Sequence, residues 1–165
     1  MADISTLARK FKVEVLAGSE DPAGEVSWLP VRGIQELTPS KEDNLEDDSD
    51  YDSDGWTSQV RTGQSWSLEL SVARKQSGAA GAQAYDPGQE LVRAASDQFG
   101  IDGTVWVRWF NRDGGDEAYQ GLAQAGFTDN GGASTALSTA TITLTGTGKR
   151  ERIENPAEAE APVGG

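Results

Sequence analysis

Between Ser65 and Val72 the sequence alternates strictly between polar and apolar side chains. In an extended strand this alternation places Trp66, Leu68, Leu70 and Val72 on one face and the intervening polar residues on the other. A helix would scatter the same residues around its circumference, because its period is 3.6 residues. The stretch therefore predicts a strand with one buried face, and it requires a sheet with an apolar side.

Other segments also have strand character, and turn-forming residues separate them. The expected strands are residues 11–17, 26–37, 104–110, 117–130 and 134–149. Within the second of these, Pro30 and Gly33 indicate a sheet edge, a bulge or a bend.

One helix is expected, at about residues 87–99. Asp86 can cap its N-terminus, Pro87 suits the first helical position, and Gly100 can end it. Its apolar face would consist of Leu91, Val92, Ala95 and Phe99.

Strands and helix do not alternate, so a doubly wound parallel sheet is not expected. The order predicts a mainly β fold with one flanking α-helix, built as an antiparallel β-sandwich or barrel. This domain would span residues 11–148. Residues 1–10 are predicted to be a flexible N-terminal arm, and residues 149–165, rich in Pro, Ala and Glu, a disordered C-terminal tail.

The strand at 104–110 has apolar side chains on both faces, interrupted only by Arg108. Trp106 and Trp109 are three residues apart, so they point to opposite sides of the sheet. Such a strand needs cover on both sides, from a helix, a second sheet or another subunit.

Composition excludes several kinds of site. The chain has no Cys and no His, which removes disulfides, thiolate chemistry, Ser-His-Asp triads and most zinc or iron sites. The net charge of -13 disfavours binding of nucleic acid through a basic patch. The sequence shows neither a signal peptide nor a membrane-spanning segment, which predicts a soluble protein made in a cytoplasm.

Residues 38–56 contain eight carboxylates and one Lys and are predicted to form a long acidic loop. Asp50, Asp52 and Asp54 have the spacing that opens a calcium-binding loop, and Gly55 follows them. However, position twelve of such a loop requires a bidentate Glu, and Arg61 occupies it. The three aspartates therefore remain candidates only for a looser cation site, and a solvated acidic loop is the simpler interpretation.

Two further functions find little support in the residues. A glycosidase needs two carboxylates whose environments separate their pKa values, which a solvated acidic run does not provide. Gly78 and Gly81 lack the Lys and Ser or Thr of a phosphate-binding loop and indicate a flexible linker.

The last long strand has a row of hydroxyl groups on one face: Thr139, Thr141, Thr143 and Thr145. Ordinary solvent exposure with good β propensity explains such a row. A smooth neutral surface past which something slides is the functional alternative.

From Trp28 to Val72, and in segment order over residues 8–148, the chain resembles phage tail tube proteins, the major tail proteins of long non-contractile tails. The resemblance rests on a strand, a long polar loop closing in "YDSDGW" and a strand of the "SWSLEL" type. It implies a β-sandwich or barrel of the tail tube type, shared with contractile tails and type VI secretion tubes. It also implies a structural virion protein, neither enzyme nor cofactor binder and not inserted in a membrane, made in the host cytoplasm.

The same resemblance implies an assembly. Six copies would form a ring, and stacked rings would form a tube around a tape measure protein, through which DNA later passes without specific binding. Further partners would be the tail terminator and the distal tail or baseplate proteins. The assembly loop would contain Asp48, Asp50, Tyr51, Asp52, Asp54, Gly55 and Trp56. Its cationic partners on a neighbour would be drawn from Arg61, Arg74, Lys75, Arg108, Arg112 and residues 149–152, and the threonine row would line the lumen.

A different class of protein stays open at this point. A monomeric calcium- or carbohydrate-binding β module would also fit a β domain with an acidic loop and several Trp residues. An uncharacterised hydrolase is the third alternative.

Overall fold

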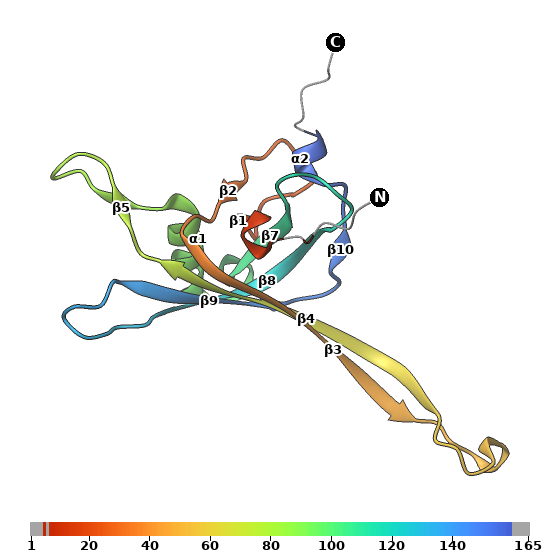
Figure 1. Cartoon of the computed structure of the whole chain (residues 1–165). Coiled ribbons are helices and arrows are strands. Elements are labelled where there is room, and N and C mark those ends of the chain that lie inside the picture. The colour runs from red at the N-terminus through yellow and green to blue at the C-terminus, as the bar shows by residue number, and fades with distance from the viewer. Residues whose placement is uncertain (1–4, 6, 160–165) are drawn as a thin grey trace.

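A curled antiparallel sheet forms the body of the molecule (Figure 1). The computed structural model describes residue 5 and residues 7–159. The main sheet has the strand order β2-β1-β7-β8-β9-β4-β3, with β10 paired to β8, and β5 and β6 form a separate small hairpin. The strands are β1 (Phe11–Ala17), β2 (Leu29–Pro30), β3 (Ile34–Asp47), β4 (Gln59–Ala73), β5 (Gln76–Ser77), β6 (Ala84–Tyr85), β7 (Thr104–Asn111), β8 (Ala118–Asp129), β9 (Thr139–Gly146) and β10 (Glu151–Arg152). The helices are α1 (Pro87–Ser96) and α2 (Pro156–Ala159), with short 3-10 turns η1 (Ala8–Lys10), η2 (Tyr51–Ser53) and η3 (Gly100–Gly103).

All strand pairs in the main sheet are antiparallel, which confirms the predicted fold class. The core lies inside the curl. As the alternation predicts, Trp66, Leu68, Leu70 and Val72 of β4 are all buried. Alternate residues of β1, β7 and β9 complete this core, so β-period burial explains most of the apolar sequence.

Helix α1 packs against the same core through Val92 and Ala95. The carboxylate of Asp86 accepts a hydrogen bond from the backbone N–H of Gln89, and Pro87 occupies the first turn, as predicted. The helix ends at Ser96, earlier than expected. The prediction that Phe99 belongs to its buried face is wrong, because Phe99 lies beyond the helix and is exposed.

The predicted acidic loop at 38–56 is wrong over most of its length. Residues up to Asp47 form β3, which pairs with β4 from Leu37↔Leu70 to Asp47↔Gln59, with one register shift between Asn44 and Leu45. The two strands extend beyond the body as a long β-hairpin (Figure 1). Pairing between β3 and β4 satisfies the backbone N–H and C=O groups of this segment. Both faces of the hairpin are in water, so its strands form without alternating apolar side chains.

The predicted disordered tail at 149–165 is also wrong where the structure describes it. Strand β10 pairs with β8, and Asn155 is buried, with its Nδ2 donating to the carbonyl oxygens of Asn111 and Gly115. Residues 160–165 lie outside the described residues. Of the predicted N-terminal arm, residues 8–10 form η1, and residues 1–4 and 6 are not described.

Strand β7 is covered on both sides, as its sequence requires. On the core side Trp109 is buried in the cluster that also contains the α1 residues. On the other side the Arg108 guanidinium stacks on the Trp28 ring, and the segment around Asn155 hydrogen-bonds to the end of β7. The second cover thus comes from the chain's own loop and C-terminal segment. None of the helices in the described part is long and apolar enough to cross a membrane.

Candidate assembly surfaces

The tip of the β3–β4 hairpin is an ordered turn. Asp50 caps η2: its Oδ1 accepts from the backbone N–H of Asp52 at 3.0 Å, and its own N–H donates to Ser53 Oγ at 3.0 Å. Asp54 then adopts a left-handed conformation with φ of 52°, and Gly55 follows with φ of 81°. Asp and Gly are among the residues that tolerate this backbone, so the sequence "DSDG" fixes the turn.

Hydrogen bonds also close the neck of the tip. The backbone N–H of Ser58 donates to Ser49 Oγ at 2.7 Å, and that of Ser49 donates to Asp47 Oδ1 at 2.8 Å. The side chain and the backbone N–H of Ser49 both hydrogen-bond to the Asp47 carboxylate. They lower the pKa of Asp47, because they favour its ionised form. The tip therefore has a defined shape although it lies far from the core.

The three candidate metal ligands do not form a cation site here. Asp50 Oδ1 is committed to the cap, and it also accepts a hydrogen bond from Ser53 Oγ. No group of three or more Asp or Glu side chains in the described part of the chain is arranged to hold a metal ion. The spacing of Asp50, Asp52 and Asp54 is instead the spacing of a capped turn.

Large apolar side chains are exposed on this hairpin. Trp56 at the tip is 82% exposed, and Tyr51 beside it is fully exposed. Leu45 and Val60 lie exposed further down the two strands. Exposed aromatic residues on an ordered projection are typical of anchors that are buried in a partner.

Two of the predicted inter-subunit cations serve the subunit itself. Arg74, with a side chain only 5% exposed, donates to Gln89 Oε1 and Glu90 Oε1 and stacks over Tyr85. Arg108 is held by the Glu14 carboxylate at 3.2 Å beneath Trp28. Both guanidinium groups therefore already have a carboxylate partner inside the subunit, and their contact with a neighbouring copy stays a prediction.

The remaining predicted cations differ in availability. Arg61 pairs with Asp43 across the same hairpin at 3.2 Å. Arg150 stacks on Tyr119, and Arg152 Nε donates to the Asp116 carbonyl. Arg112 is exposed and uses its Nε only toward the Lys10 carbonyl oxygen.

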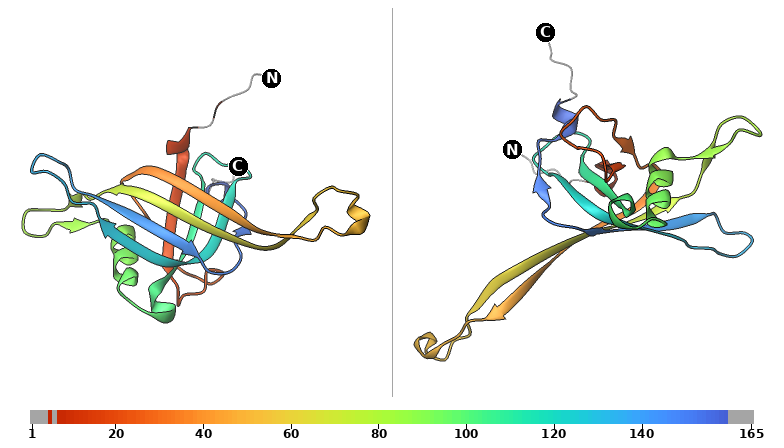
Figure 2. Two further views of the ribbon diagram at one scale, coloured as in Figure 1. Left: turned by 90° about the horizontal axis from the view of Figure 1, so that it is seen from below. Right: turned by 180° about the vertical axis from the view of Figure 1, so that it is seen from behind.

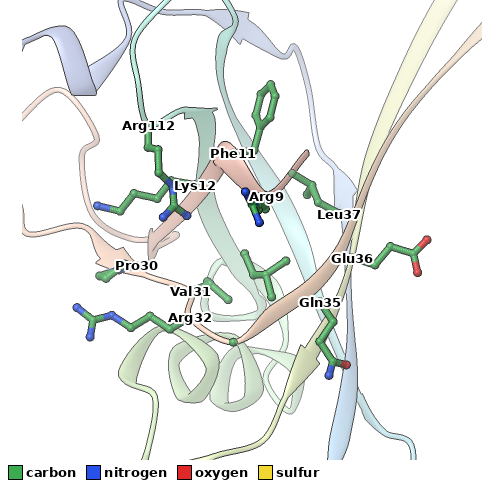
Figure 3. A pocket seen from close by; sticks show the side chains of 12 residues that line it. Arg9, Phe11, Lys12, Pro30, Val31, Arg32, Gln35, Glu36, Leu37 and Arg112 are labelled. Carbon is green, nitrogen blue, oxygen red and sulfur yellow. The ribbon is translucent and has the colours of Figure 1, made fainter. Parts of the chain in front are cut away.

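A groove of about 680 Å³ lies where the curled sheet remains open, between β1 and the base of β3 (Figure 3). Four cationic side chains line it: Arg9, Lys12, Arg32 and Arg112. They come from η1, β1, the β2–β3 connection and the turn that follows β7. Sequence reasoning missed this cluster because its members are dispersed along the chain; only the predicted edge at Pro30 pointed toward it.

The threonine row belongs to a wider hydroxyl face. Thr141, Thr143 and Thr145 lie on the outer side of β9, while Ala140, Ile142 and Leu144 are buried. Registered pairing places neighbouring polar residues of β4 and β8 on the same side: Ser67, Ser71, Gln124 and Thr128. The face is mostly uncharged, with Glu69 as the carboxylate opposite Thr143.

Comparison with solved structures identifies the architecture. The chain is similar to the tail of an empty gene transfer agent particle with C6 symmetry, with a TM-score of 0.67 and 12% identity over 90% of this chain and 99% of that one. It is similar to the SPP1 tail tube, with a TM-score of 0.65 and 13% identity over 94% of this chain and 84% of that one. It is also similar to the baseplate of the anti-feeding prophage, with a TM-score of 0.61 and 10% identity over 93% of this chain and 98% of that one. Neither a scan of protein families nor a search of curated proteins gives a match. The tail tube fold expected from the sequence is thereby confirmed.

Proposed function

We propose that this chain is a tail tube protein, whose copies form six-membered rings that stack into the tube of a phage-type virion. The observation that carries the proposal is the tail tube fold over nine-tenths of the chain, shared with a tail of C6 symmetry. DNA would pass through the tube toward a host.

The open borders of the sheet support assembly. In the described residues β3 pairs only with β4, which leaves its outer edge free along the body. At the other end of the sheet β2 has two residues and covers only part of β1. Unpaired edges recruit other strands, so a ring in which each sheet continues into the next would satisfy both borders.

The β3–β4 hairpin is the assembly arm of this proposal. Its tip contains the predicted assembly residues Asp48, Asp50, Tyr51, Asp52, Asp54, Gly55 and Trp56 in one ordered turn. Burial of Trp56 and Tyr51 against a neighbour would supply apolar contact area that the isolated subunit leaves in water.

The hydroxyl face around Thr143 suits the lumen. Its side chains are small and mostly uncharged, and the whole chain carries a net charge of -13. A wall of this kind, on a protein of net negative charge, attracts phosphates little and offers DNA few contacts. Thr139, Thr141, Thr143 and Thr145 are therefore proposed to face the passing DNA.

Other partners follow from the position of a tube within a tail. A tape measure protein would occupy the lumen during assembly, and terminator and distal tail or baseplate proteins would close the ends. The likeness to a baseplate structure supports the last of these.

Negative-stain electron microscopy of the purified protein tests the proposal. We expect rings or tubes with six-fold symmetry, and a matching ring mass by light scattering as concentration rises. A monomer at every concentration, with heats of calcium or oligosaccharide binding in calorimetry, would favour the alternative β module.

A further inference from the structure

The groove between β1 and the base of β3 is a concentration of positive charge on a strongly acidic protein. It gathers four of the chain's 14 Lys and Arg side chains. Arg9, Arg32 and Arg112 are exposed, and Lys12 is half-buried. None of the four takes part in an ion pair within the described residues, whereas the neighbouring Lys10 pairs with Asp113.

Carboxylates near the groove do not neutralise these cations. Glu36 lines the groove, but Figure 3 shows its side chain directed away from the four cations. Asp86 accepts hydrogen bonds from the backbone N–H groups of Arg32 and Gln89 rather than from a side-chain cation. The groove thus presents unpaired positive charge beside the apolar side chains of Phe11 and Leu37.

The hairpin tip has the complementary character. From Glu46 to Asp54 the chain carries six carboxylates and no cation. Further down the hairpin, Asp43 is paired with Arg61 and Lys41, but no ion pair reaches the tip among the described residues. Trp56 and Tyr51 add exposed aromatic surface beside this charge.

The tip cannot reach the groove of its own subunit. Leu37 borders the groove and Asp47 belongs to the tip, and the ten residue steps from one to the other along β3 span about 33 Å at about 3.3 Å per residue. The hairpin runs away from the body over this length (Figure 2). Any contact between the two surfaces is therefore between copies.

We infer that the basic groove formed by Arg9, Lys12, Arg32 and Arg112 receives the acidic hairpin tip, Glu46 to Trp56, of a second copy of this chain. The inference rests on the proposed function and names the partner surface of its assembly arm. Because tip and groove are different patches, the contact is heterologous: each copy offers a free tip and a free groove to further copies. Repetition of this contact extends an assembly rather than closing a dimer.

Charge reversal tests the pairing. The tip variant is Glu46→Lys with Asp48→Lys and Asp52→Lys, and it spares the capping residue Asp50. The groove variant is Lys12→Glu with Arg32→Glu and Arg112→Glu. Each alone should raise the protein concentration needed for assembly by about tenfold or more, since attraction becomes repulsion at several sites. The chain with both sets should assemble again.

A matched control makes the same change of charge as the tip variant, at three carboxylates outside the tip and the groove. Glu20→Lys with Glu25→Lys and Glu117→Lys alters exposed residues outside both surfaces, and it should assemble like the parent chain. Circular dichroism melting of every variant checks that the subunit remains folded. If the control fails as the tip variant does, overall charge controls assembly and the inference is overturned.

Site-directed cross-linking gives a readout that does not require tubes, because the chain has no native Cys. An Asp52→Cys chain mixed with a Lys12→Cys chain should give a cross-linked heterodimer with a short bis-maleimide. The same tip chain with a Glu20→Cys chain should not. Tubes that form without this cross-link, and that still form when either reversal is made alone, would overturn the inference while the proposed function stands. If the cross-link forms but neither rings nor tubes do, the contact between tip and groove stands and the proposed function fails.

Discussion

The rings of Trp66 and Trp109 lie 5.6 Å apart between centroids, although β4 and β7 are separated in the sheet by β8 and β9. This contact spans the interior of the curl and closes the core. The ring centroids of Trp109 and Tyr119 lie 5.7 Å apart. Trp66 Nε1 donates a hydrogen bond to the Gly148 carbonyl oxygen at 3.0 Å. The indole of Trp66 thus holds the sheet in its curled form through apolar and polar contacts.

Gly121 provides the space in which this indole lies. A Cβ at Gly121 would overlap the six-membered ring of Trp66. We expect Gly121→Ala to lower the free energy of unfolding by about 1–3 kcal/mol, the usual cost of overpacking a core. Urea denaturation measures it. Gly63→Ala is the control, because its Cβ would have Asn44 at 3.8 Å as its nearest neighbour; a change there as large as at Gly121 would contradict the steric explanation.

The ion pair between Arg74 and Glu90 predicts a pH dependence of stability. Desolvation alone would raise the pKa of Glu90, but hydrogen bonds and charge from Arg74 and Arg93 outweigh it and lower the pKa below its ordinary 4.5. A carboxyl with a lowered folded-state pKa contributes stability above its unfolded pKa, and this contribution is lost as pH falls through the folded value. Melting temperatures should therefore drop below about pH 4.5, and Glu90→Gln should flatten that part of the profile. An unchanged acid limb in Glu90→Gln would show that other carboxylates control it.

The buried pair of Arg108 and Glu14 predicts non-additive mutations. Arg108→Leu leaves the Glu14 carboxylate buried without its partner and removes the guanidinium under Trp28, which should cost about 3–5 kcal/mol of folding free energy. Arg108 also has a buried Nε that finds no hydrogen-bond partner among the residues described by the structure, so the pair is incompletely satisfied. The double variant with Glu14→Leu should regain much of that loss. A double variant no more stable than Arg108→Leu would contradict a penalty from the unpaired buried carboxylate of Glu14.

The body of the fold could be predicted from local patterns because its strands bury one face. Leu68 and Leu70 alternate with polar residues, and Asp86 with Pro87 marks the helix start, so period and caps were sufficient. The two-sided character of β7 also followed from the spacing of Trp106 and Trp109.

The hairpin and the groove could not be predicted in this way. Residues 38–47 are strand although no face of theirs is buried, so polarity indicated a loop where backbone pairing with β4 decides the structure. The sequence offers Arg74 and Arg108 as cations for a neighbouring copy, because it does not show that Glu90 and Glu14 meet them within the subunit. The groove joins Arg9, Arg32 and Arg112 only through the folded topology.

Trp56 should be needed for assembly and not for folding. Its ring is 82% exposed, and its backbone N–H donates to the Ser53 carbonyl oxygen, a bond that alanine keeps. We therefore expect Trp56→Ala to change the unfolding free energy of the subunit by less than about 0.5 kcal/mol. Loss of a large aromatic anchor at an interface should cost about 2 kcal/mol or more, which corresponds to more than about tenfold in the concentration required for assembly. Leu137→Ala, 83% exposed on the loop between β8 and β9, is the control for removing an exposed apolar side chain. Tubes of normal length and concentration dependence from Trp56→Ala would show that the tip does not anchor neighbouring copies through its indole.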